Sequence, residues 1–132
     1  MRWDIGVDLG TKNIWLAEQK AGPVLGEAAA LAFREGASRP FAAGDAAQAL
    51  EGRACAGVSV HRPLKDGTLQ NPFHAQCLLE WAFARSEALQ GTKHFSALIT
   101  CSPSSRPVQS AALAGAAVEA GAADAALVRS DA

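Results

Sequence analysis

The ten residues from Asp4 to Asn13 constrain this chain more than any other segment does. They read Asp-Ile-Gly-Val-Asp-Leu-Gly-Thr-Lys-Asn, so a short apolar strand carries Asp8 near its end and breaks at once at Gly10 and Thr11. A carboxylate is rarely buried unless it is paired or bound to a cation, which argues against a packing role for Asp8. One acid, exposed backbone N–H groups and a hydroxyl at a strand end favour a site for a metal-bound nucleotide phosphate.

Length and composition restrict the class of protein. The chain has 132 residues, of which 49% are hydrophobic and 19% charged, as expected for one soluble globular domain. The net charge of −1 gives no general reason to expect nucleic acid as a partner. No apolar run approaches the roughly 20 residues that span a bilayer, and the N-terminus lacks a signal-peptide pattern, so we expect a cytoplasmic protein.

The cysteines and histidines are too dispersed to predict a metal site or a disulfide framework. Cys55, Cys77 and Cys101 are widely spaced and include no Cys-x-x-Cys pair. We therefore expect three reduced, buried side chains. None of the three histidines has a second ligand at helical or hairpin spacing, so we expect no metal there.

The pattern of apolar residues predicts an antiparallel meander followed by two helix–strand units. Because parallel strands need crossover connections, the second half implies parallel pairing with right-handed crossovers. The expected fold class is α/β with a mixed sheet. The predicted strands cover 3–9, 13–18, 24–26, 28–33, 39–42, 58–61, 95–101 and 124–128. The predicted helices cover 46–50 with Asp45 as N-cap, 72 to about 89 with Asn71 as N-cap, and 106–120 with Ser104 or Ser105 as cap. A polar turn is predicted over 62–67.

Four patches of the sequence together resemble one protein family. They are residues 4–13, Arg62-Pro63-Leu64-Lys65-Asp66-Gly67, Ser102-Pro103-Ser104 and Glu119-Ala120-Gly121-Ala122. Their order and separations resemble the N-terminal part of the bacterial rod-shape-determining actin homologues, the MreB-like members of the actin-like ATPase superfamily. The first patch alone is weak, because sugar kinases and heat-shock chaperone ATPases share it. The hexapeptide is the most diagnostic patch.

The resemblance implies the ribonuclease-H-like fold of the actin-like ATPases, with a small inserted subdomain. Residues 1–26 and 63–132 would form a part similar to subdomain IA, and 27–62 the insertion similar to subdomain IB. Together they would be the N-terminal lobe, with the second phosphate loop, the adenosine pocket and the second lobe beyond Ala132. The implied function is that of a nucleotide-dependent, filament-forming, cell-shape-determining ATPase. Its partners would be further filament subunits and inner-membrane-associated wall-synthesis proteins.

The cofactors that the resemblance implies are ATP and Mg²⁺, bound weakly by an isolated lobe. Asp8 would hold Mg²⁺ through water, and Gly10 would let the backbone approach the phosphates. Thr11, Lys12 and Asn13 would offer N–H groups and polar side chains to the phosphates. An ordinary hairpin turn with a solvated Asp8 stays open as an alternative, in which Lys12 is a surface charge. The residues from Lys65 to Gly67 are expected to be a structural turn without a ligand.

One departure from the family concerns catalysis. Family members usually carry Glu-Glu-Pro after the last strand, where this chain has Arg129-Ser130-Asp131. Because the acidic pair helps to position the attacking water in the family, we expect weak or absent hydrolysis and assign no catalytic residue. A non-catalytic interaction module, which binds through the exposed faces of 27–62, is the alternative. The hexapeptide speaks against a fragment of a heat-shock chaperone ATPase or a sugar kinase.

Overall fold

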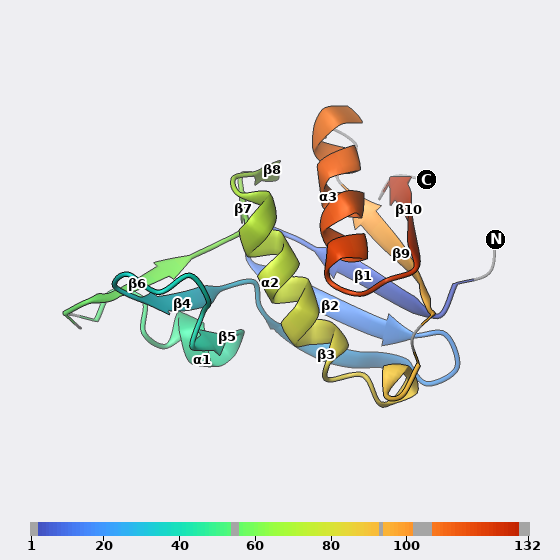
Figure 1. Cartoon of the computed structure of the whole chain (residues 1–132), viewed down its shortest axis with the longest axis horizontal. Helices are drawn as coiled ribbons and strands as arrows, with labels where there is room; N and C mark the ends of the chain where they lie inside the picture. The colour runs from blue at the N-terminus through green and yellow to red at the C-terminus, as the bar shows by residue number, and fades with distance from the viewer. Residues whose placement is uncertain (1–2, 54–55, 93, 102–106, 130–132) are drawn as a thin grey trace.

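A computed structural model describes residues 3–53, 56–92, 94–101 and 107–129 of the chain. A larger part is built on a five-stranded sheet, and a smaller part on a three-stranded sheet lies beside it along the long axis of the molecule (Figure 1). The expected capping role of Ser104 or Ser105 lies outside the described residues, as do Cys55 and the side chain of Cys101. Cys77 is buried, as expected.

The larger part centres on a mixed sheet with the strand order β10-β9-β1-β2-β3. β1 pairs antiparallel with β2, and β2 with β3, whereas β9 lies parallel to both β1 and β10. This order confirms the predicted meander followed by parallel strands, although the third strand is longer than 24–26. The strands are β1 (Ile5–Leu9), β2 (Asn13–Glu18), β3 (Gly22–Ala28), β9 (Ser96–Cys101) and β10 (Asp124–Arg129).

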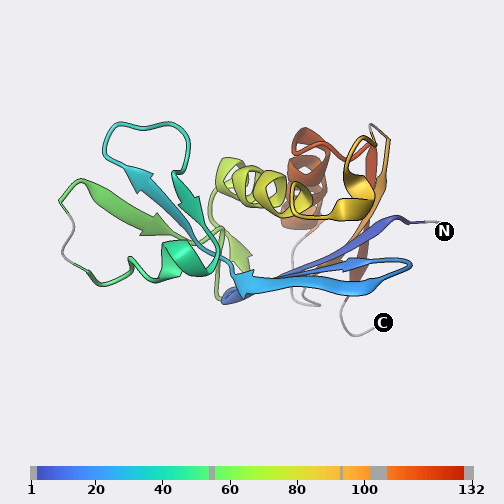
Figure 2. The same ribbon diagram turned by 90° about the horizontal axis from the view of Figure 1, so that it is seen from below.

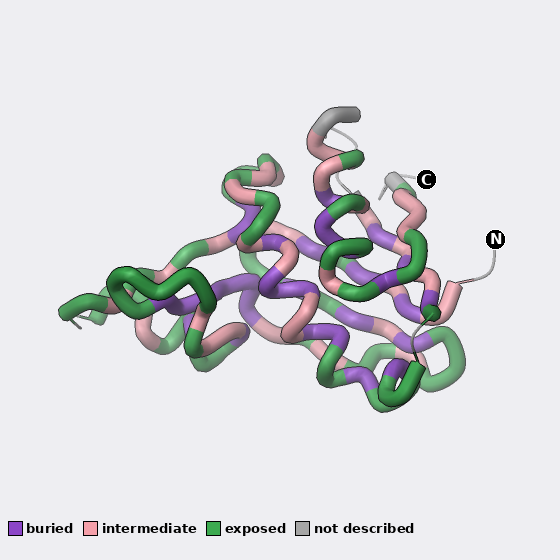
Figure 3. The backbone as a smooth tube through the Cα atoms, in the orientation of Figure 1, coloured by how far each residue is buried: buried purple, intermediate pink, exposed green. Residues whose placement is uncertain are grey.

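Two helices, α2 (Pro72–Phe83) and α3 (Pro107–Glu119), cover one face of this sheet and contact each other (Figure 2). Successive side chains of a strand point to opposite faces, so every second residue of the central strands packs against the helices. Buried positions follow these strands and α2 in Figure 3. The largest buried side chains include Ile5, Val7, Ile14, Leu16, Ile99, Leu78 and Leu79. Their burial fixes the opposite orientation for the residues between them.

The other face of the five-stranded sheet carries no helix in the described part of the chain (Figure 2). Asp8 lies on this face, and the register places Trp15 of β2 and Thr100 of β9 next to it. Trp15 is 54% exposed. Its ring lies over Gly26, where a Cβ would be 2.2 Å from the indole, so only glycine leaves room for it. Within the described residues, the face that carries Asp8 is therefore not covered by a helix, and Asp8 is exposed on it.

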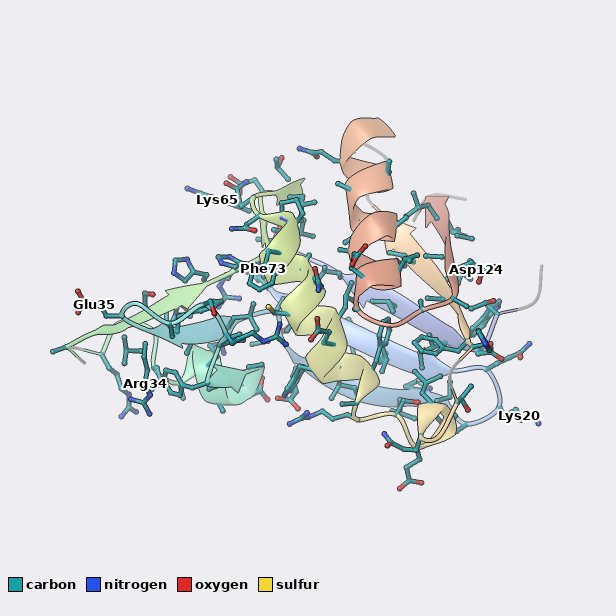
Figure 4. The ribbon with its side chains drawn as sticks, in the orientation of Figure 1. Lys20, Arg34, Glu35, Lys65, Phe73 and Asp124 are labelled. Carbon is teal, nitrogen blue, oxygen red and sulfur yellow. The ribbon has the colours of Figure 1, made fainter. Side chains whose placement is uncertain are left out.

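The smaller part is a sheet of the order β5-β4-β6 with a one-turn helix. Its elements are β4 (Leu31–Arg34), β5 (Ala42–Ala43), α1 (Asp45–Gln48) and β6 (Val58–His61). β4 and β5 begin later than the predicted strands 28–33 and 39–42. A separate small core consists of buried alanines, whose short side chains let the strands and α1 approach closely. Arg34 and Glu35 lie at its outer end (Figure 4).

Asp45 joins the small sheet to the end of β3. Its Oδ1 accepts a hydrogen bond of 2.8 Å from the N–H of Ala28, and its own N–H donates to Glu27 Oε1 at 3.0 Å. The prediction of Asp45 as the N-cap of α1 is wrong, because Gly44 holds that position and no side chain caps the helix. The carboxylate binds a donor on a different element instead. Gly44, at φ 70°, also packs against Trp81, where a Cβ would be 2.6 Å from the ring.

A two-stranded hairpin, β7 (Leu64–Lys65) and β8 (Thr68–Leu69), follows the small sheet. Asp66 and Gly67 connect its strands with φ angles of 52° and 76°, as a type I′ turn requires. The predicted turn over 62–67 is therefore the tip of a hairpin that begins with a short strand. Lys65 extends from it into solvent (Figure 4).

The start of α2 matches the prediction. Asn71 is the N-cap, and its Oδ1 accepts hydrogen bonds from the N–H groups of Phe73 at 2.9 Å and His74 at 3.3 Å. These bonds satisfy two donors that have no partner within the first turn of a helix. Pro72 follows at the first helical position, where its missing N–H costs nothing.

The end of α2 differs from the prediction. The helix stops at Phe83, and a 3₁₀ turn, η1 (Glu87–Leu89), follows instead of a helix that continues to about 89. The cause is Glu18 at the end of β2, which is only 8% exposed. Its Oε2 accepts hydrogen bonds from Ser86 Oγ at 2.7 Å and from the N–H of Ala88 at 3.1 Å. A backbone N–H that would continue the helix bonds to this carboxylate.

We predict that Glu18 makes the free energy of unfolding depend on pH in the acidic range. The hydrogen bond from Ser86 and then that from Ala88 hold the pKa of the Glu18 carboxyl below its ordinary value of 4.5. A group with a lowered pKa in the folded state stabilises the fold above its unfolded pKa, and that contribution is lost as the pH falls below it. Glu18→Gln should therefore lower the free energy of unfolding at pH 7 and flatten its decline below about pH 4.5. Urea denaturation at a series of pH values measures both effects.

The matched control is Glu119→Gln, which removes an exposed carboxylate at the end of α3. This variant should keep the wild-type slope of stability against pH. Equal slopes for wild type and Glu18→Gln would contradict the prediction.

Candidate functional site: the turn after the first strand

Asp8 is the penultimate residue of β1. It is exposed, and it makes no hydrogen bond or ion pair with the residues that the structure describes. Its position follows from the alternation of β1, whose helix-facing residues Val7 and Leu9 are buried on either side of it. All lone pairs of the carboxylate are therefore available to a ligand within the described structure.

Gly10, Thr11 and Lys12 form the turn between β1 and β2. The N–H of Gly10 donates to the carbonyl of Asn13 at 2.9 Å, which closes the hairpin and removes this donor from any phosphate site. A Cβ on Gly10 would lie 3.4 Å from the same carbonyl oxygen, which is an ordinary van der Waals contact, so the closure of the hairpin does not itself require glycine. The N–H groups of Thr11 and Lys12 have no acceptor among the described residues. Two donors thus remain in the turn that follows Asp8, within the described part of the chain.

The hydroxyl of Thr11 is bonded to the hairpin of β7 and β8. The N–H of Gly67 donates to Thr11 Oγ1 at 2.9 Å, across 56 positions of the sequence. Because this contact is partly buried, it fixes the turn against the hairpin. The first two sequence patches, which are far apart in the chain, are therefore neighbours in space.

The carbonyl of Lys12 is held from the other side. It accepts hydrogen bonds from the N–H of Ala29 at 2.8 Å and from Nη1 of Arg62 at 3.3 Å. The side chains of Lys12 and Asn13 are exposed and have no partner among the described residues. The backbone of the turn is thus fixed, while its two polar side chains remain available to a ligand.

This arrangement can bind an anion next to a cation. Successive unsatisfied N–H groups in a turn form a site for phosphate oxygens. Mg²⁺ usually takes one or two carboxylates and keeps several waters, so a single Asp8 suits a hydrated Mg²⁺ that phosphate oxygens share. In the described ranges no group of three or more acidic, histidine or cysteine side chains could hold a metal alone. The residues present therefore fit a metal-bound phosphate better than a metal held by protein alone.

Sequence reasoning missed the part that Arg62 and Gly67 take in this site. Their patch is the most diagnostic of the four, yet the frequency of Asp-Gly turns predicts only a structural turn at this place. Its separation from the first turn gives no sign of a contact. In the folded chain, the hydrogen bonds from Gly67 to Thr11 and from Arg62 to Lys12 bring the two segments together.

Comparisons with known proteins agree with one another. The model of the MreB/Mbl protein family matches residues 2–131. The cell shape-determining protein Mbl of Bacillus cereus is 28% identical over 118 residues, which is 89% of this chain and 35% of that protein. Mbl of Bacillus subtilis is 36% identical over 66 residues, which is 50% of this chain and 20% of that protein. The chain thus spans about a third of the length of these relatives or less.

Solved structures show the same fold. The crystal structure of MreB5 of Spiroplasma citri bound to ADP has a TM-score of 0.83 and 27% identity, with 95% of this chain and 37% of that chain covered. The MamK double helical filament has a TM-score of 0.79 and 22% identity, with 96% and 40% covered. The fold is therefore that of the actin-like ATPases, as predicted.

A membrane-spanning segment is not found in the described ranges. None of their helices combines the length and the apolar character that crossing a bilayer requires.

We predict that Thr11→Val loosens the turn. The substitution keeps the shape of the side chain but leaves the N–H of Gly67 without its acceptor, which should cost about 1 kcal/mol of unfolding free energy. Hydrogen exchange at the Gly67 amide should become faster. Thr11→Ser, which keeps the hydroxyl, is the control and should retain the protection of that amide. Unchanged protection in Thr11→Val would show that the hydrogen bond does not hold the turn.

Proposed function

Because the chain belongs to the MreB/Mbl protein family, we propose that it is the first lobe of an actin-like, cell-shape-determining ATPase and binds the phosphates of Mg-ATP at the turn between β1 and β2. The observation that carries this proposal concerns the turn after β1: among the described residues, the N–H groups of Thr11 and Lys12 have no acceptor and the carboxylate of Asp8 has no donor. The similar MreB5 of Spiroplasma citri was solved with ADP, which supports a nucleotide as the ligand.

Each residue of the turn has a separate task in this proposal. Thr11 and Lys12 donate backbone N–H groups to phosphate oxygens, and Gly10 keeps the approach to the backbone free of a side chain. Lys12 and Asn13 add a cation and an amide to the same anion. Asp8 accepts hydrogen bonds from the waters of Mg²⁺, which neutralises phosphate charge when bound.

We expect the affinity of this chain for nucleotide to be low. Association costs translational and rotational freedom, and only the contacts in excess of this cost appear as affinity. The turn between β1 and β2 accounts for contacts to the phosphates but for none to the base. Arg129-Ser130-Asp131, at the place of the acidic pair of the family, leads us to expect slow or absent hydrolysis.

Self-association belongs to the same proposal. MamK, which shares the fold, assembles into a double helical filament. We propose that this chain associates with further subunits in the same manner, in the cytoplasm and in contact with wall-synthesis proteins of the inner membrane. Sedimentation with and without Mg-ATP measures such assembly.

We predict that Asp8→Asn removes the Mg²⁺ dependence of nucleotide binding. Titration of the wild-type chain with Mg-ATP should shift the NMR resonances of the Thr11 and Lys12 amides, with a Kd in roughly the micromolar to millimolar range. Asp8→Asn should weaken Mg-ATP binding by about tenfold but should not weaken binding of ATP in EDTA, because the substitution removes a negative charge beside the phosphates. The ratio of the two dissociation constants isolates the role of the carboxylate.

Asp124→Asn is the matched control. Asp124 is an exposed aspartate at the start of β10. Because β10, β9 and β1 are parallel, it lies at the end of the sheet where β1 begins, whereas the turn follows the end of β1 (Figure 4). This variant should bind Mg-ATP as the wild type does. Identical amide shifts at Thr11 and Lys12 in wild type and Asp8→Asn would contradict the proposal that Asp8 binds Mg²⁺. Absence of any shift in the wild type would favour the non-catalytic interaction module.

A further inference from the structure

Arg62 contacts two elements that are otherwise separate. It lies directly after β6, where the chain leaves the small sheet, and its side chain is 24% exposed. Nη1 donates to the carbonyl of Lys12 in the turn between β1 and β2 at 3.3 Å. Nη2 donates to Gln48 Oε1 at 3.0 Å and to Glu51 Oε1 at 3.1 Å, at the end of α1 and just after it. One guanidinium therefore bridges the proposed phosphate turn and the small sheet.

The chemistry of arginine suits this bridge. A guanidinium is planar and always charged, and its donors diverge in a fixed fork, so it can hold two acceptors on different elements at once. A lysine ammonium could pair with Glu51 but would not span both groups with the same geometry. The bridged carbonyl of Lys12 also accepts the N–H of Ala29, which stands between β3 and the first strand of the small sheet. A shift of this carbonyl therefore affects the connection between the two parts.

We propose that Arg62 is a positioning residue that couples the turn between β1 and β2 to α1 of the small sheet. A ligand that binds the N–H groups of Thr11 and Lys12 fixes the peptide groups of the turn, and Arg62 transmits that constraint to Glu51 and Gln48. By reciprocity, the state of α1 changes the affinity of the turn for its ligand. The identity of the ligand rests on the proposed function, whereas the coupling between the two elements does not.

The coupling can be tested without any nucleotide, by hydrogen exchange in a double-mutant cycle. Arg62→Ala should speed exchange of the Ala29 amide, whose acceptor is Lys12, by about tenfold. Glu51→Ala should also speed it, although Glu51 does not touch Lys12 or Ala29. In the Arg62→Ala background, Glu51→Ala should have no further effect on this amide. Equal effects of Glu51→Ala in both backgrounds would overturn the proposal.

Arg62→Lys separates positioning from a merely structural role. The lysine keeps a cation beside Glu51, so its melting temperature should stay close to that of the wild type. Exchange of the Ala29 amide should nevertheless match that of Arg62→Ala. Wild-type exchange in Arg62→Lys would overturn the proposal. Arg53→Ala is the control, because Arg53 is exposed on the same segment and its side chain has no partner among the described residues.

Mg-ADP is the probe for the ligand part of the inference. In the wild type, saturating Mg-ADP should slow exchange of the turn amides and also of the Ala49 amide, which bonds to Asp45 in α1. In Arg62→Ala the slowing should be confined to the turn. Equal slowing at Ala49 in both proteins would overturn the coupling. A wild type that does not respond to Mg-ADP would contradict the proposed function, and the nucleotide-free cycle would still decide the coupling.

Discussion

The alternation of side chains along β1 is the constraint on which the rest of this structure depends. Ile5, Val7 and Leu9 are buried under the helices, so the period of two forces Asp8 onto the opposite, open face. A slip of one residue would bury the carboxylate and expose three large apolar side chains. The central position of β1, between β2 and β9, makes such a slip costly, because it would break the register with both neighbours at once. The core thus places the acid that the proposed site needs.

The turn that follows β1 is fixed by elements from the rest of the chain and not by its own sequence alone. The hairpin of β7 and β8 holds the hydroxyl of Thr11, and Arg62 with Ala29 holds the carbonyl of Lys12. These contacts use acceptors of the turn and leave its donors at Thr11 and Lys12 unpaired in the described structure. A turn whose shape is already set loses little conformational freedom when an anion binds, which favours binding. The fold and the proposed phosphate site are therefore linked by the same hydrogen bonds.

The sequence predicted what depends on local periodicity and short-range chemistry. The first hairpin and the Asn71-Pro72 start of α2 follow from local patterns, and the parallel pairing in the second half follows from the succession of helices and strands. The structure confirms all three. The errors at Asp45 and at the end of α2 have a common cause. In both places a side-chain carboxylate bonds to a backbone N–H of an element distant in the sequence, which no local pattern reveals. The contact between Thr11 and Gly67 was out of reach for the same reason.

The two carboxylates of the first hairpin show why Asp8 is the better candidate for a ligand. Glu18 stands at the far end of β2 on the helix-facing side, where Ser86 and Ala88 donate to it and lower its pKa. Those donors compensate its burial, as a buried charge requires, and leave Glu18 committed to the fold. Asp8 lies at the other end of β1, on the face without a helix, and has no donor in the described structure. The turn that follows it contains two N–H groups, those of Thr11 and Lys12, without acceptors among the described residues. The carboxylate of Asp8 and a bound phosphate are both negative, so they can lie close together only when a cation lies between them. The unpaired carboxylate therefore favours phosphate that binds together with Mg²⁺ over phosphate alone.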